Sequence, residues 1–263
     1  MANNNLTSEW KRLAAKEKRF LEKRAEKTDS LLNQKLAEKI PDKLQETLDA
    51  AFAKAFHVIF DKGTDYIEKT YNKETLEHEH QVDMYAAELR QDKKALRNFS
   101  KKASATGRKN ILISGAAGIG MGLVGVGLPD IPVFTGMLLK NIYEIALQYG
   151  FEYESEEERY FILRLIEGSL SYGDDIVAIN RELNEYIYSL EIPKDYDKED
   201  QIKKTSAALS SELLYMKFLQ GIPIVGAVGG AYDVIYMKKV NDYAKLKYNR
   251  RFLEGQLLGS DTF

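Results

Sequence analysis

The sequence predicts an all-α fold of roughly eight to ten helices. Only five of its 263 residues are prolines. Apolar residues recur three and four positions apart through most of the chain, which is the period of an amphipathic helix. No stretch sustains the apolar–polar alternation of a half-buried strand, and no strand–helix rhythm appears. With 44% hydrophobic and 30% charged residues, the chain can build a core.

The first part of the chain reads as a series of charged helices. A helix over residues 6–40 ends at Pro41, which suits the first turn of the next helix. That second helix covers residues 42–61. Residues 63–102 then predict one or two further helices, with a break near 71–72.

Helix boundaries are clearest in the second part. The amphipathic helix over residues 133–149 is followed by Gly150, a good C-cap. Ser155 precedes Glu158 by three positions, which is the spacing of a capping box at the start of the next helix. Further helices are predicted over residues 174–190 and 198–219. An acidic loop separates these two helices. After them comes a long final helix that enters at Pro223.

Two glycine-rich apolar segments interrupt the charged pattern. Residues 110–129 carry no charge and include six glycines, and residues 218–232 form a second charge-free stretch. Because glycine lets helix backbones approach closely, we expect the two segments to pack together at the core. The alternative is a coincidence between two helix starts. Gly122, Gly125 and Tyr232 are the candidate lipid or ligand contacts.

A nucleotide-binding hypothesis fails on its context. Gly120, Gly122 and Gly125 match G-x-G-x-x-G, but the motif needs a strand, a helix and a second strand. Here prolines interrupt the helix and helices follow. Tyr243 and Lys247 repeat the Tyr-x-x-x-Lys spacing of short-chain dehydrogenases, yet they lie in a helix rich in both residue types.

No metal or cofactor is predicted. The chain has no cysteine, so it offers no thiolate ligand and no disulfide. Glu77 and His80 form one Glu-x-x-His motif, whereas di-iron bundles need two with further glutamates. Asp130 and Asp233 are lone carboxylates in apolar surroundings. Asp130 suits a helix cap, and the functional alternative puts both at the floor of a lipid or ligand pocket.

Charge distribution points to an anionic membrane surface. The basic stretch of residues 90–109 directly precedes the first glycine-rich segment, and basic residues also follow the second. Cationic flanks beside apolar segments are attracted to anionic lipid headgroups. The predicted headgroup contacts are Lys101, Lys102, Arg108, Lys109, Arg250 and Arg251. The net charge of −2 and the absence of a recognisable motif argue against nucleic acid.

Residues 127–166, "GLPDIPVFTGMLLKNIYEIALQYGFEYESEEERYFILRLI", and residues 221–254, "GIPIVGAVGGAYDVIYMKKVNDYAKLKYNRRFLE", resemble the EcsC protein family. The resemblance covers about residues 40–256. It implies a bacterial, cytoplasmic protein at or near the inner face of the cell membrane, associated with an ABC-type exporter. It brings no agreed catalytic residues.

Together these features predict a charged N-terminal extension (1–40), an EcsC-like all-α domain (41–256) and a short tail (257–263). The expected function is that of a non-catalytic peripheral membrane or lipid-binding accessory protein, with membrane transporter subunits as possible partners. Two alternatives stay open. One is an enzyme with a buried carboxylate site at Asp130 and Asp233, and the other is an interaction module that uses acidic residues 152–200.

Overall fold

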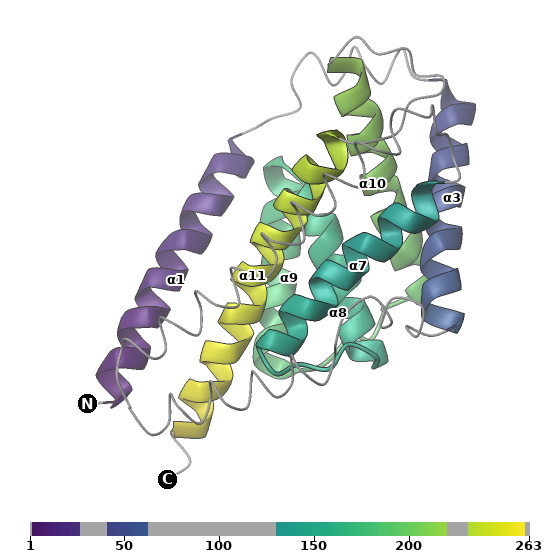
Figure 1. The fold of residues 1–263 in the computed structure, drawn as a ribbon. Helices are drawn as coiled ribbons and strands as arrows, with labels where there is room; N and C mark the ends of the chain where they lie inside the picture. Colours follow the sequence, from purple (N-terminus) through teal and green to yellow (C-terminus); the bar gives the residue numbers. More distant parts are fainter. Residues whose placement is uncertain (1, 27–40, 63–129, 220–230, 261–263) are drawn as a thin grey trace.

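The computed structural model describes residues 2–26, 41–62, 130–219 and 231–260. Within these ranges it contains seven α-helices and no strand (Figure 1). The all-α prediction is therefore confirmed. The count of eight to ten helices stays a prediction, because residues 63–129 lie outside the described ranges.

The central helix is α11 (Ala231–Ser260). It packs against α1 (Ala2–Ala25), α7 (Asp130–Gln148), α8 (Glu156–Leu170) and α9 (Gly173–Ser189). Figure 1 shows α1 at one edge of the molecule, alongside α11. Helix α11 is thus covered on several sides, although its sequence is rich in lysine, arginine and tyrosine.

The opposite edge is built from α3 (Asp42–Lys62) and α10 (Lys198–Leu219). These two helices pack on each other, α10 also packs on α8, and α3 packs on α7. Both helices agree closely with the predicted ranges, because Pro41 and the acidic first turns mark their starts.

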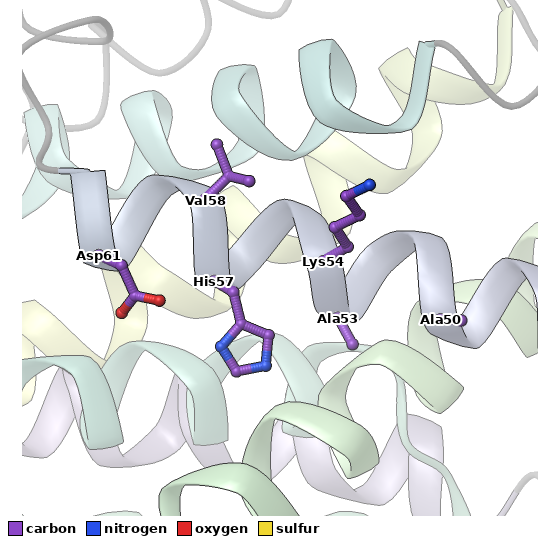
Figure 2. A pocket seen from close by; sticks show the side chains of 6 residues that line it. All are labelled: Ala50, Ala53, Lys54, His57, Val58 and Asp61. Atoms are coloured by element: carbon purple, nitrogen blue, oxygen red, sulfur yellow. The ribbon is translucent and has the colours of Figure 1, made fainter.

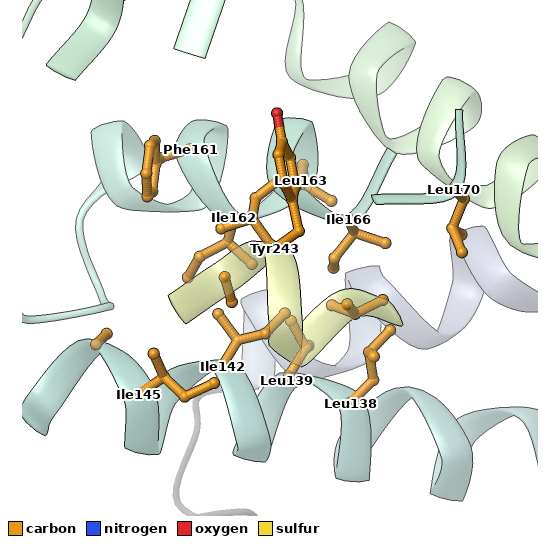
Figure 3. Close-up of a cluster of buried hydrophobic side chains, with 14 of the residues drawn as sticks. Leu138, Leu139, Ile142, Ile145, Phe161, Ile162, Leu163, Ile166, Leu170 and Tyr243 are labelled. Carbon is orange, nitrogen blue, oxygen red and sulfur yellow. The ribbon is translucent and has the colours of Figure 1, made fainter. Parts of the chain in front are cut away.

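Apolar side chains of α7 and α8 face α11 from two sides and form the core (Figure 3). Leu138, Leu139 and Ile142 of α7 are fully buried, as are Phe161 and Ile162 of α8. Each such side chain contributes about 1.5–3 kcal/mol on burial. The three-and-four spacing in the sequence was therefore a reliable guide to this core.

Helix α7 ends as its sequence predicts. Gly150 has a φ of 80°, a conformation that a side chain disfavours. The amide of Phe151 donates to the carbonyl of Ala146 at 3.0 Å, and the amide of Gly150 donates to Leu147 at 2.9 Å. This pair of bonds is a Schellman motif, which satisfies carbonyls left over at the helix end.

The predicted capping box before α8 forms only by half. Ser155 is the N-cap, and its hydroxyl accepts a hydrogen bond from the Glu158 amide at 3.1 Å. The Glu158 side chain is buried instead and bonds to Tyr248 and Arg251 of α11. A tertiary partner thus replaces the local one that the box requires.

The first helix differs from its prediction. Helix α1 begins at Ala2 and ends at Ala25, whereas the predicted helix covered residues 6–40. Residues 27–40 lie outside the described ranges. Helix α1 is also packed against α11 and α9, and Leu13 belongs to the common core.

Close packing at a glycine occurs at a position that sequence reasoning did not select. A Cβ at Gly168 of α8 would lie 2.8 Å from Cγ2 of Ile179 and 3.1 Å from Cε1 of Tyr243. The missing side chain therefore lets α9 and α11 approach α8. Gly122 and Gly125, for which this role was predicted, lie outside the described residues, so the predicted glycine-rich core is not confirmed.

We expect Gly168→Ala to lower the free energy of unfolding by about 1–3 kcal/mol, since the new methyl group overpacks the contact. Gly136→Ala is the matched control, because a Cβ at Gly136 of α7 would meet nothing within 4 Å. That variant should be stabilised by about 0.5–1 kcal/mol through helix propensity. Urea denaturation followed by circular dichroism measures both, and equal effects would contradict the close approach.

Candidate functional site

Buried ion pairs along α11 are the most distinctive chemistry of the described residues. Three glutamates from three other helices, each 2–7% exposed, bond to cations of α11. They are Glu17 of α1, Glu158 of α8 and Glu212 of α10. A cation that is cut off from water needs such a partner, because an unpaired buried charge is costly.

The Glu17 group contains the most deeply buried cation of the three groups. Lys247 has no exposed side-chain surface, and its Nζ lies 2.6 Å from Oε1 of Glu17 and 2.7 Å from Oδ1 of Asn184. Arg250 donates to the second oxygen, Oε2, at 2.6 Å. The Asn184 amide also donates to Oε1 at 3.1 Å. The carboxylate of α1 is therefore held by groups from both α9 and α11.

Burial and pairing act against each other on these charges. Burial alone would raise the pKa of Glu17, but Lys247, Arg250 and Asn184 lower it to about 2. Burial lowers the pKa of Lys247 to about 8, because loss of water outweighs the attraction of Glu17. Pairing thus outweighs burial at Glu17, whereas burial outweighs pairing at Lys247. Such a pair selects a geometry more than it adds stability.

Tyr243 lies beside this group and completes a polar layer between helices. Its hydroxyl donates to Oδ1 of Asn180 at 3.0 Å, its ring stacks on Phe20 of α1 at 4.8 Å, and burial raises its pKa well above 10. A proton-transferring tyrosine needs a lowered pKa, so this environment opposes the dehydrogenase role that the Tyr-x-x-x-Lys spacing suggested.

The second group joins α8 to α11. Glu158 accepts a hydrogen bond from the Tyr248 hydroxyl at 2.6 Å and pairs with Arg251. The Arg251 guanidinium also lies over the rings of Phe151 and Phe161, at 4.2 and 5.4 Å from their centroids. Burial raises the pKa of Glu158 in spite of Arg251.

The third group ties α10 to α11 near the start of α9. Lys239 pairs with Glu212 and donates to the hydroxyl of Tyr172 at 2.9 Å. Burial opposes the charge of Lys239, but Glu212 and Tyr172 raise its pKa overall. The hydroxyl of Tyr236 donates to the carbonyl of Glu212, so the same glutamate is anchored through its backbone.

These groups give Arg250 and Arg251 internal partners. Both were predicted to face lipid headgroups, but their side chains are only 20% and 14% exposed and each bonds to a buried glutamate. The basic residues that follow the second glycine-rich segment are therefore largely neutralised within the protein. A headgroup role for these two arginines has no support in this geometry.

The other predicted site residues are placed only in part. Helix α7 begins at Asp130, and Asp233 is the third residue of α11, but their side chains, like that of Tyr232, lie outside the description. Gly122 and Gly125 lie outside it entirely, as do four of the basic residues: Lys101, Lys102, Arg108 and Lys109. Their roles stay predictions.

The structure does bring the starts of α7 and α11 together. The rings of Phe134 and Tyr236 meet edge to face with centroids 6.3 Å apart, and Asn141 donates to the sulfur of Met237 at 3.2 Å. Further along, Tyr149 lies beside Phe252 at 6.1 Å. The contacting residues follow in the same order along both helices, so α7 and α11 run in the same general direction from neighbouring starts.

A shallow groove lies apart from the buried pairs, on α3. It has a volume of about 440 Å³, and its lining side chains all come from that helix (Figure 2). His57 in this lining lies 3.2 Å from Glu199 of α10. The wall includes Val58, Lys54 and Asp61, but no member of the ion-paired groups.

The acidic region 152–200 is only partly a free surface. Arg164 pairs with Glu167 at 2.7 Å and with Glu182, and Glu156 lies within 3.3 Å of Lys198. Several of its carboxylates therefore serve to join helices α8, α9 and α10. In the described residues no cluster of three or more histidine, aspartate or glutamate side chains is placed to bind a metal ion. None of the helices described is both long and apolar enough to cross a bilayer.

Sequence reasoning missed the three glutamates that organise α11. One signal was available in α1, where Glu17 continues the inward spacing of Trp10 and Leu13 and is followed by Phe20. A carboxylate within an apolar stripe predicts a buried counter-charge. The identity of that counter-charge depends on tertiary packing.

We expect Glu17→Gln to lower the free energy of unfolding by up to about 3–5 kcal/mol, because Lys247 and Arg250 lose their carboxylate and Lys247 must then stay charged without a partner or give up its proton. Lys247→Met should cost clearly less, since Arg250 still pairs with Glu17. The control is the exposed pair Lys18–Glu22 of the same helix, where Glu22→Gln should change stability by less than about 0.5 kcal/mol. Urea denaturation at pH 7 decides the order, and a larger loss for Lys247→Met would contradict this account.

Lys247 also predicts a pH dependence. Folded Lys247 loses its proton near pH 8, whereas the unfolded chain holds it until about pH 10.5. The unfolded state binds more protons in this interval, so stability rises with pH there. Between pH 8 and 10, the unfolding free energy of the natural chain should therefore rise relative to that of Lys247→Met. A constant difference would show that Lys247 titrates normally.

Comparisons with known proteins find relatives in Bacillus subtilis. Protein EcsC of Bacillus subtilis (strain 168) is 20% identical over 251 residues, which cover 94% of this chain and 93% of that protein. A second Bacillus subtilis protein, named "Uncharacterized protein YdbA", is 27% identical over 134 residues, or 47% of this chain and 46% of its own length. The chain thus matches about half of this second relative. No solved structure matches.

The model of the EcsC protein family matches residues 7–253. This range includes α1, which the sequence alone had set apart as an extension ending at residue 40. It also spans the described helices that supply the three buried glutamates and their partners on α11. The chain belongs to the EcsC protein family.

Proposed function

We propose that this protein is a non-catalytic accessory protein that works at the inner face of the cell membrane and binds anionic lipid. The two glycine-rich apolar segments would make the lipid contact, and the basic stretch of residues 90–109 would hold them at the surface. The observation that carries the proposal is the meeting of α7 and α11 at their starts.

Each of these two helices directly follows one glycine-rich segment. Residue 129 is bonded to the first residue of α7, and residue 230 is bonded to the first residue of α11. Since Phe134 and Tyr236 are in ring contact, the two helix starts to which the segments are joined lie close together. Two apolar segments joined at neighbouring points can form one contact surface, which supports joint action on a membrane.

The electrostatic part of the proposal depends only on the basic stretch of residues 90–109. Four cations of α11 bond to buried glutamates and so are not offered to headgroups: Lys239, Lys247, Arg250 and Arg251. Residues 90–109 carry eight lysines and arginines against one aspartate. Each basic residue near an anionic surface contributes about 1 kcal/mol to binding.

The environment of the buried charges supports a non-catalytic role. Glu17 and Glu158 are saturated by lysine, arginine, asparagine and tyrosine partners. The groove on α3 includes neither of them. A general acid or base must reach a substrate, and neither carboxylate borders that groove. Family membership adds an ABC-type exporter to the proposal as the membrane partner.

A second candidate function rests on the same meeting of helix starts. Asp130 opens α7 and Asp233 lies in the first turn of α11, so their backbones lie near the common entry of the two segments. A pair of carboxylates at such a place suits a catalytic site in a pocket between the segments. This enzyme would be favoured if the protein does not bind lipid and if the binding of a ligand requires both aspartates.

Vesicle flotation tests the lipid proposal. The natural chain should float with vesicles that contain phosphatidylglycerol, and binding should weaken with salt and on neutral phosphatidylcholine vesicles. Replacing Lys101, Lys102, Arg108 and Lys109 together by glutamine should weaken the binding at least about tenfold, because up to four headgroup interactions are lost.

The matched control removes the same charge from elsewhere. Lys11, Lys43, Lys194 and Lys203 are exposed on the described helices and loops, and their fourfold replacement by glutamine should leave flotation nearly unchanged. Equal losses in the two variants would show a general charge effect. No flotation with either kind of vesicle at low salt would reject the lipid proposal and leave a protein-interaction role through residues 152–200.

A further inference from the structure

The interface beneath α1 is rich in charged side chains. Of the α1 side chains that the structure describes, three are buried, and two of these are glutamates: Glu9, Leu13 and Glu17. The buried face of α7 is more apolar, with leucine, isoleucine, Phe134 and Tyr143 beside Thr135, Asn141, Glu144 and Gln148. Polar contact surfaces are typical of parts that dock and separate, whereas permanent interfaces are more apolar. Helix α1 therefore has the surface of a docked element.

The inward face of α1 is a stripe with a defined order of side chains. Trp10, Leu13, Glu17, Phe20 and Arg24 follow one another three and four positions apart, so they share one side of the helix. Trp10 lies under Arg250 at 4.7 Å and Phe20 stacks on Tyr243 at 4.8 Å. The carboxylate thus lies between two aromatic anchors.

The partner surface, which we name the α1 cradle, is formed by Asn184 of α9 and by Tyr243, Lys247 and Arg250 of α11. It presents two cations and an amide toward one carboxylate. At one end of the stripe Arg24 donates to the carbonyl of Ser169 and, at 3.4 Å, to that of Ser171, where α8 ends. The stripe carries a negative charge at Glu17 and a positive charge at Arg24, and each has its own partners. These two points define both the position and the direction of the stripe.

This pattern says what the cradle accepts. An apolar helix would leave Lys247 buried without a counter-charge, which costs several kcal/mol. A bilayer is an equally unfavourable environment for the inward face of α1, since that face carries the charges of Glu17 and Arg24. The fitting occupant is an amphipathic helix with one carboxylate between aromatic residues.

We propose that the α1 cradle is a docking site for an amphipathic helix that carries a carboxylate between aromatic side chains, and that α1 is its resident, exchangeable occupant. The outer face of α1 is exposed and charged, with Lys11, Lys18, Arg19 and Lys23. Among the described helices α1 packs mainly on α11 and α9, so α1 can leave the cradle without separating any other pair of them. A partner protein that presents the same stripe would compete with α1.

The only tryptophan of the chain reports on this docking, because Trp10 lies in the stripe itself. In the Glu17→Gln chain, Trp10 emission should shift to longer wavelength and acrylamide quenching should rise about twofold, while most of the helical circular dichroism is kept. Glu22→Gln is the control, since it removes a carboxylate from the outer face of the same helix. Its Trp10 signal should match that of the natural chain.

A labelled peptide of residues 2–26 then tests the site in trans by fluorescence anisotropy. A tethered helix has an effective concentration near the millimolar range, so the natural chain should bind the peptide weakly. The Glu17→Gln chain should bind the natural peptide at least tenfold more tightly than the natural chain does. It should also prefer that peptide at least tenfold over the Glu17→Gln peptide.

Leu13→Ala provides a second full-length variant, because it weakens the apolar contact of α1 and keeps Glu17 paired. It should give the same peptide preference if the Glu17→Gln chain does not fold. Equal affinity for the two peptides, an unchanged Trp10 signal in both variants, or collapse of the whole helical fold in both would overturn the proposal.

Discussion

Helix α11 imposes the constraint on which the rest of this structure depends. It is packed by α1, α7, α8 and α9, yet its sequence carries lysine and arginine on several of its faces. Outside the exposed strip that contains Lys238 and Asp242, the charges of such a helix must receive counter-charges from its neighbours. Glu17, Glu158 and Glu212 meet this need from three directions, and each of them therefore positions a different helix against α11.

These ion pairs serve specificity more than stability. The apolar contacts of α7 and α8 supply most of the burial, and a leucine-for-leucine contact tolerates a shift of one turn. A buried lysine does not, because a displaced glutamate leaves a charge unpaired. The lowered pKa of Lys247 shows that its own charge is costly at this site. The pairs thus set the register in which α1, α8 and α10 meet α11.

The same arrangement changes how the charge pattern relates to a membrane. Basic residues on both sides of the two glycine-rich segments first suggest two cationic flanks. In the fold, the flank on α11 is occupied by glutamates, so residues 90–109 remain as the one that suits headgroups. The contacts between the starts of α7 and α11 nevertheless place the two points at which these segments join the described helices near each other. Lipid binding and helix exchange at the α1 cradle would then use different parts of the molecule.

The sequence by itself determined the helical class, the ranges of α3, α9 and α10, the end of α7 and the start of α8, because periodicity, prolines, Gly150 and the Ser155 cap are local signals. It also determined the family, through residues distributed along most of the chain. Only the tertiary structure decided that Glu158 leaves its capping box for Arg251, that Gly168 is the glycine of close approach, and that Arg250 belongs to Glu17. These pairings join residues up to 233 positions apart. No local pattern encodes them, since a charged side chain needs a specific partner only after packing has excluded water from it.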